Sequence, residues 1–177
     1  MRLEEKGVAL NIPDNLKWEK IDEMEFYRNI SHLGLKAVDF AFYGRERLVF
    51  LEIKNFKPNL EDIRDENLRK EKRREIIKGF SPEKINIQLA NKLVSSVYII
   101  FGKKLRKPKK IIFCALLILP QDLECYLPFI NTSLGNLKTE DENLLKVSVL
   151  VLNNVELVER RIINSLLLPD KGKRRRG

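Results

Sequence analysis

The sequence is poor in the residues that build cysteine and histidine metal centres. Its 177 residues include only two cysteines, Cys114 and Cys125, which form no Cys-x-x-Cys pair, and one histidine, His32. Zinc sites take most of their ligands from these residue types, so zinc hydrolase chemistry with several imidazoles is excluded. The same scarcity argues against a cysteine zinc site and against a disulfide framework.

Long hydrophobic runs are also missing. The longest apolar run, residues 111–119, is far shorter than the roughly 20 residues that cross a bilayer. The first residues, MRLEEKG, lack the apolar stretch of a signal peptide. We therefore expect a cytoplasmic protein with no membrane partner. The length predicts a single domain over residues 1–169, followed by a basic, disordered tail over 170–177.

Positive charge, in contrast, is abundant and clustered. The net charge is +9, and eleven basic residues lie in just two segments, 103–110 and 171–176, so that the remainder carries −2. Clustered basic charge is typical of proteins that bind a phosphate backbone, although a solubilising loop and a loose tail would give the same pattern. The candidate nucleic-acid contacts of the first segment are Lys103, Lys104, Arg106, Lys107, Lys109 and Lys110.

The order of predicted elements indicates an α/β domain with one central mixed sheet flanked by helices. Residues 14–33 are expected to form a helix, which Asp14 caps and Gly34 ends. The other expected elements are a strand at 37–43, a turn at 44–47, a strand at 48–56, a solvated helix or mobile flap at 60–79, a helix at 81–98, a buried strand at 111–119, a strand at 146–152 and a helix at 155–168, with 120–145 unassigned.

Three charged residues interrupt the apolar hairpin VDFAFYGRERLVFLEIKNF of residues 38–56. Asp39 lies near the start of the first strand, and Glu52 and Lys54 lie in the second. Charges in such runs are costly unless they are paired or bind a metal. The hairpin would bring both carboxylates to one end of the sheet, and side-chain alternation puts Lys54 on the same face as Glu52.

Two carboxylates at one sheet edge suit a magnesium ion, which prefers oxygen ligands and keeps several waters. Asp39, Glu52 and the backbone carbonyl of Ile53 are the candidate metal ligands. Lys54 could orient an attacking water and stabilise charge beside the metal. The alternative is an exposed edge hairpin with a Glu/Lys cross-strand pair, but the second strand is apolar on both faces.

The arrangement of Asp39, Glu52 and Lys54 resembles the motif of the PD-(D/E)XK nuclease superfamily. Val38 stands where many members have proline before the aspartate. The resemblance has motifs from Glu25 to about Tyr98. It implies a restriction-endonuclease-like αβββαβ core, dependence on Mg²⁺ or Mn²⁺, and hydrolysis that leaves a 5′-phosphate.

The resemblance also implies further site residues. Archaeal Holliday junction resolvases carry an extra glutamate on the first helix, and Glu25 is the matching candidate, ahead of Glu19 and Glu23. Many members place a glutamine or lysine near the phosphate from the helix that follows the Glu-x-Lys strand. Gln88, or with less support Lys92, would take that role, unless Gln88 belongs to a solvated helix face.

The expected function is therefore that of a metal-dependent deoxyribonuclease, an endonuclease for which DNA is favoured over RNA, with branched or structured DNA as a candidate substrate and a homodimer as a candidate assembly. End trimming, restriction or defence, and cleavage of RNA remain open alternatives. One alternative is a catalytically silent nucleic-acid-binding subunit with the same fold. Another is an architectural or RNA-associated basic protein that acts through residues 103–110 and 171–176 alone.

Overall fold

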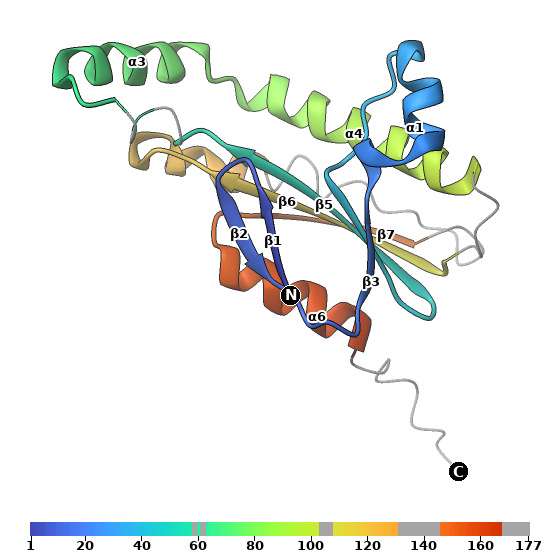
Figure 1. The fold of residues 1–177 in the computed structure, drawn as a ribbon. Coiled ribbons are helices and arrows are strands. Elements are labelled where there is room, and N and C mark those ends of the chain that lie inside the picture. Colours follow the sequence, from blue (N-terminus) through green and yellow to red (C-terminus); the bar gives the residue numbers. More distant parts are fainter. Residues whose placement is uncertain (58–59, 61–62, 103–107, 131–145, 168–177) are drawn as a thin grey trace.

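A five-stranded mixed sheet forms the centre of the computed structural model, which describes residues 1–57, 60, 63–102, 108–130 and 146–167 (Figure 1). The strand order is β3-β4-β5-β6-β7, antiparallel from β3 to β5 and parallel from β5 to β7. The fold is thus mixed α/β. The strands are β3 (Lys17–Lys20), β4 (Phe40–Tyr43), β5 (Arg47–Asn55), β6 (Lys110–Ile118) and β7 (Lys146–Leu152).

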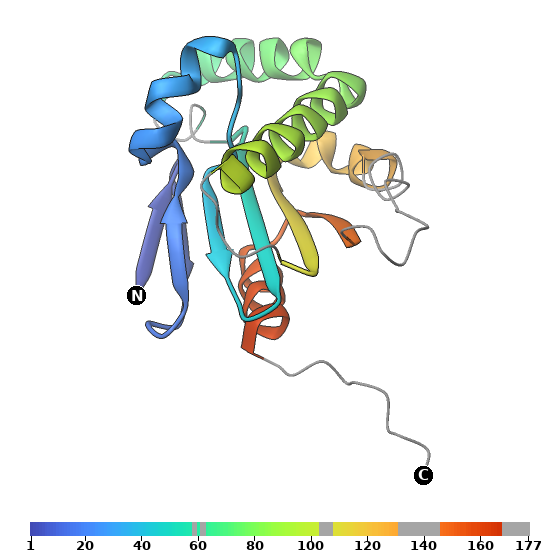
Figure 2. The same cartoon turned by 90° about the vertical axis from the view of Figure 1, so that its right-hand side faces the viewer.

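Helices cover both faces of this sheet (Figures 1 and 2). The long helix α4 packs on one face, and α6 with the N-terminal hairpin β1–β2 packs on the other. The hairpin and helices are β1 (Arg2–Glu5), β2 (Val8–Asn11), η1 (Ile21–Glu23), α1 (Glu25–Ile30), η2 (Ser31–Leu33), α3 (Glu66–Gly79), α4 (Pro82–Gly102), η3 (Gln121–Tyr126) and α6 (Val155–Leu167).

Strand β5 separates two apolar cores because its side chains alternate between the faces of the sheet. Leu48 and Phe50 pack in the core under α4, while Val49, Leu51 and Ile53 pack in the core beside α6. Glu52 lies on the same face of β5 as Leu48 and Phe50 and therefore faces α4. It is only 1% exposed. The alternation predicted from the sequence is confirmed.

Most predicted elements are present with shifted ends. The β4–β5 turn closes with a 2.8 Å hydrogen bond from the Gly44 amide to the Arg47 carbonyl. Helix α3 begins later than expected, at Glu66, where the Asp65 side chain caps it. On α4 the predicted stripe faces the core, with Ile85, Leu89 and Leu93 buried and Val97 partly buried.

The helix predicted over residues 14–33 is wrong in its first half. Residues 17–20 form β3, an edge strand that pairs with β4, and the chain becomes helical only from Ile21, in the three short pieces η1, α1 and η2. Trp18 packs edge-on against Phe40, so sheet pairing and aromatic packing override the helical spacing. The predicted end is correct, because Gly34 caps η2 with φ of 77°.

The hairpin β1–β2 has no counterpart in the sequence-based prediction. Its two strands pair in register, from Arg2 opposite Asn11 to Glu5 opposite Val8, around the turn Lys6-Gly7. In the unassigned segment 120–145, residues 121–126 form η3. Residues 103–107, 131–145 and 168–177, which include most of the basic loop and the tail predicted at 170–177, lie outside the described residues.

Candidate active site

Two buried carboxylates meet at the end of the β4–β5 hairpin. Asp39 directly precedes β4, and Glu52 lies in β5 next to Leu51, the partner of Phe40, so the antiparallel register brings both acids to one level of the sheet. They are 6% and 1% exposed. The backbone amide of Ile53 donates a 2.6 Å hydrogen bond to Asp39 Oδ2 and fixes that carboxylate.

The ammonium of Lys6, from the β1–β2 turn, lies between these acids. Its Nζ donates hydrogen bonds to Asp39 Oδ1 at 2.7 Å, to Asp39 Oδ2 at 2.9 Å and to the Ile53 carbonyl at 2.8 Å. Glu52 Oε1 is 3.8 Å away. These four oxygens belong to the three residues that the sequence predicts as metal ligands, and a lysine cation sits among them.

Helix α4 supplies the other polar contacts. Lys92 Nζ donates a 2.6 Å hydrogen bond to Glu52 Oε2, and Lys54 Nζ donates a 2.9 Å hydrogen bond to Gln88 Oε1. Lys54 Nζ is also 4.0 Å from Glu52 Oε1. Gln88 and Lys92 are one helical turn apart, so they share the face of α4 that lies over the end of β5. The structure therefore brings Asp39, Glu52, Lys54, Gln88 and Lys92 together.

Burial dominates the electrostatics of this cluster. It raises the pKa of Glu52, and the charge of Asp39 adds to that shift, whereas Lys92 and Lys6 oppose it. Burial also lowers the pKa of Lys54 against the pull of Glu52. For Lys6 burial acts in the same direction, but the charges of Glu52 and Asp39 outweigh it and raise the pKa. The same site thus raises the pKa of Lys6 and lowers the pKa of Lys54.

One atom of the cluster lacks the partner that its burial demands. Glu52 Oε1 is buried and receives no hydrogen bond. Together with the oxygens of Asp39 and the Ile53 carbonyl, all of which face Lys6 Nζ, this orphaned carboxylate oxygen makes a hard oxygen donor set of the kind that magnesium or manganese accepts. Within the described residues no group of three or more His, Cys, Asp or Glu side chains converges, so a metal held at this position would have two carboxylates and one backbone carbonyl as protein ligands.

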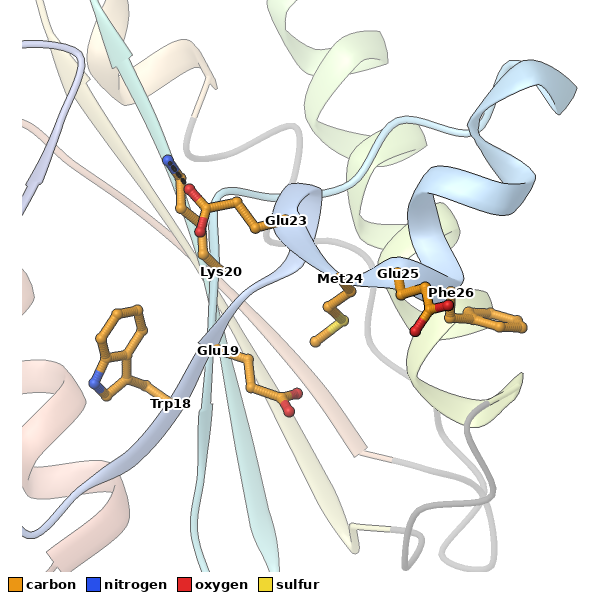
Figure 3. A pocket seen from close by; sticks show the side chains of 7 residues that line it. All are labelled: Trp18, Glu19, Lys20, Glu23, Met24, Glu25 and Phe26. Atoms are coloured by element: carbon orange, nitrogen blue, oxygen red, sulfur yellow. Dashed lines mark ion pairs between the residues drawn. The ribbon is translucent and has the colours of Figure 1, made fainter.

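Glu25 lies apart from this cluster. It is exposed at the start of α1 and lines a pocket of about 560 Å³ with Glu19, Glu23 and other residues of β3, η1 and α1, shown in Figure 3. Glu19 accepts a 2.6 Å hydrogen bond from Tyr43, and Glu23 pairs with Lys20. Among the described residues, no hydrogen bond or ion pair joins Glu23 or Glu25 to Asp39 or Glu52.

The end of the basic loop lies at the opposite end of the sheet. Lys110 starts β6 opposite Arg47, whereas Glu52 is opposite Ala115, five residues further along the parallel pair. At about 3.3 Å per residue, this separates Lys110 from the level of Glu52 by roughly 16 Å along the strands. Lys109 is already paired with Glu46 at 2.5 Å. The predicted nucleic-acid residues Lys103, Lys104, Arg106 and Lys107 lie outside the described residues.

Sequence reasoning missed Lys6 altogether. The sequence did contain a sign of the hairpin. Two short stretches, RLEE and VALN, are separated by the dipeptide Lys6-Gly7, and glycine at the second position is typical of a two-residue hairpin turn. The element against which this hairpin packs could not be predicted from the sequence. Its two strands pair with each other, and β2 contacts α6, which lies about 150 residues further along the chain.

Comparison with known proteins does not add to this geometry. No protein-family model matches the chain, and neither curated proteins nor solved structures gave a significant match. Among the described residues, no helix has the length and apolar character that crossing a membrane requires.

Proposed function

We propose that this chain is a Mg²⁺- or Mn²⁺-dependent endonuclease that hydrolyses phosphodiester bonds of DNA, with a restriction-endonuclease-like core. The observation that carries the proposal is the convergence of Asp39, Glu52 and the Ile53 carbonyl around one cation position, with Lys54 beside it. Asp39, Glu52 and Ile53 would hold the metal. Its chemistry would be the stabilisation of the negative charge that develops on the phosphate.

The side chains around that position have separate tasks in this proposal. Lys54, whose pKa burial lowers, is 4.0 Å from Glu52 and can orient an attacking water or hold a phosphate oxygen. Gln88 accepts its hydrogen bond from Lys54 and positions the ammonium. Lys92 compensates the charge of Glu52 Oε2 and leaves Oε1 available.

The element order supports the proposed core from its first strand onward. The antiparallel strands β3, β4 and β5 are followed by α4 and then by β6, which runs parallel to β5. This is the βββαβ part of the order that the resemblance implies. The first helix of that order is not found before β3; the short α1 follows β3 instead.

The test is cleavage of a panel of labelled substrates with Mg²⁺ or Mn²⁺: linear, nicked, flapped, four-way and single-stranded DNA, and a matching RNA. We expect Asp39→Asn, Glu52→Gln and Lys54→Ala each to lose at least about 100-fold in rate. Glu83→Gln and Lys84→Ala change exposed residues of α4 outside the cluster and serve as matched controls. Equal cleavage by the wild type and the site variants would refute the assignment.

A specific observation favours a second function, that of a catalytically silent nucleic-acid-binding subunit. Lys6 Nζ already satisfies Asp39 and the Ile53 carbonyl, as a permanent replacement for a metal would. That function predicts DNA binding with no dependence on Mg²⁺, and no loss of binding in Asp39→Asn. Calorimetric titration with Mn²⁺ separates the two functions, because only the nuclease has to bind a metal ion.

A further inference from the structure

The β1–β2 turn places Lys6 at the carboxylates in an unfavourable backbone conformation. Among the described residues, Lys6 is the one non-glycine residue with positive φ, at 51°, and Gly7 follows at 72°. Turns with positive φ at both central residues favour asparagine, aspartate and glycine, and lysine has no local advantage there. The far end of the side chain, which makes three hydrogen bonds to Asp39 and Ile53, accounts for a lysine at this position.

The backbone of this turn is held in place, but the side chain has a path to water. Leu3 and Leu10 anchor the hairpin strands in the core, and the Asn55 side chain donates a 3.1 Å hydrogen bond to the Lys6 carbonyl. The Lys6 side chain nevertheless remains 38% exposed, whereas the Asp39 side chain is 7% exposed. Rotation of the Lys6 side chain alone can therefore vacate the cation position without unfolding the hairpin.

We infer that Lys6 is an internal competitor of the divalent cation. Its ammonium and a metal ion require the same oxygens of Asp39 and Ile53, so one excludes the other. With no metal bound, Lys6 neutralises the buried acids; when a metal binds, the side chain turns out to solvent. Lys6 thus sets the metal affinity of the site, an inference that rests on the proposed function.

The first experiment compares the Mn²⁺ affinity of the full chain and its variants by calorimetry without nucleic acid. Lys6→Asn removes the ammonium and places a residue suited to positive φ in the turn. Arg2→Gln removes one exposed charge from the same hairpin and is the control. We expect Lys6→Asn to bind Mn²⁺ at least about tenfold more tightly than wild type, because an internal competitor lowers the fraction of binding-competent protein. Arg2→Gln should bind as wild type does.

The second experiment follows the side chain itself. Amine acylation, quantified peptide by peptide with mass spectrometry, compares Lys6 with Lys20 in the presence and absence of Mn²⁺. Lys20 forms ion pairs with Glu5 and Glu23, outside the cluster, and should be labelled at the same rate in both conditions. Lys6 should be labelled several-fold faster when Mn²⁺ is bound, since its ammonium then lies in solvent.

The outcomes separate this inference from the nuclease proposal. Equal or weaker Mn²⁺ binding by Lys6→Asn overturns the competition and leaves the nuclease proposal intact. Slower labelling of Lys6 with Mn²⁺ overturns it as well. Absence of Mn²⁺ binding in both wild type and Lys6→Asn overturns the competition together with the metal-dependent function. If Lys6→Asn binds Mn²⁺ and the wild type does not, the competition is supported, and Lys6 excludes the metal from the wild-type site.

Discussion

The backbone amide of Val38 donates a 2.9 Å hydrogen bond to the hydroxyl of Ser96, in a fully buried contact between the segment before β4 and helix α4. Val38 occupies the position where the resembling nucleases often have proline, which has no amide hydrogen to donate. The bond ties the residue next to Asp39 to the helix that carries Gln88 and Lys92. A proline at position 38 could not make this contact, which holds the segment that carries Asp39 against α4.

Replacement of Ser96 by alanine should destabilise the protein. The change leaves the buried Val38 amide without an acceptor, at a cost of about 1–3 kcal/mol in the free energy of unfolding. Urea unfolding followed by circular dichroism measures it. Ser95→Ala, at the neighbouring and similarly buried position, is the matched control and should cost less, since no amide of another described element bonds to Ser95. A Ser96→Ala variant as stable as Ser95→Ala would show that the hydrogen bond contributes little.

Replacement of Lys92 by methionine should expose the cost of burying Glu52. Glu52 Oε2 loses its 2.6 Å partner while the methionine keeps the apolar stem. We expect the free energy of unfolding to fall by about 1–3 kcal/mol, because a buried carboxylate oxygen loses its hydrogen-bond donor while Lys6 and Lys54 still offset part of the Glu52 charge. The double variant Glu52→Gln/Lys92→Met should lose less than the sum of its single changes, measured from urea midpoints. Additive losses would indicate that the two side chains do not interact energetically.

Two glycines should respond to alanine in opposite directions. A Cβ at Gly44 would lie 2.9 Å from Leu166 Cδ2 and 3.2 Å from the Arg47 carbonyl oxygen, so the Leu166 side chain and the backbone of the β4–β5 turn would both have to shift. Gly44→Ala should therefore lower the free energy of unfolding by about 1–3 kcal/mol. A Cβ at Gly79, the last residue of α3, meets nothing within 4 Å. At Gly79, alanine should raise the free energy of unfolding by as much as about 1 kcal/mol, because its helix propensity exceeds that of glycine. Thermal midpoints compare the pair, and the same sign for both would contradict this reading of the turn.

The two cysteines should differ in reactivity. Burial raises the pKa of Cys114 to about 12, whereas Cys125 is exposed. Dithionitrobenzoate at pH 8 should therefore react with one thiol per native chain and with two after denaturation. Because the folded pKa of Cys114 exceeds its unfolded value, its contribution to stability is complete below about pH 9 and falls as the pH rises toward 12. Cys114→Ala should remove this part of the alkaline loss; two fast thiols in the native protein would refute the burial of Cys114.

The sequence was informative wherever a local pattern and the tertiary contacts agreed. The apolar run of β6, the hairpin β4–β5 and the stripe of α4 were predicted because each buries the face that its periodicity marks. The grouping of Asp39, Glu52 and Lys54 followed from the hairpin register and from side-chain alternation. The residues Gln88 and Lys92 followed from the resemblance.

The failures share a different cause. The segment around Trp18 has helical spacing, yet its pairing with β4 is a long-range contact that periodicity does not record. Lys6 reaches Ile53 across 47 residues, and its role depends on how the first hairpin packs against α6. Long-range contacts of single flexible side chains leave no repeat in a sequence, so the cation at the centre of the cluster could be found only in three dimensions.

The placement of Lys110 at one end of the sheet and of Glu52 near the other has a consequence for ligand length. The offset of roughly 16 Å corresponds to about five base pairs at 3.4 Å per step of duplex. Under the proposed function, a duplex lying along the strands would have to exceed this length before it could contact both Lys110 and the cluster around Glu52. A shorter duplex would contact one of the two places at a time, so its affinity would gain from both only above about five base pairs.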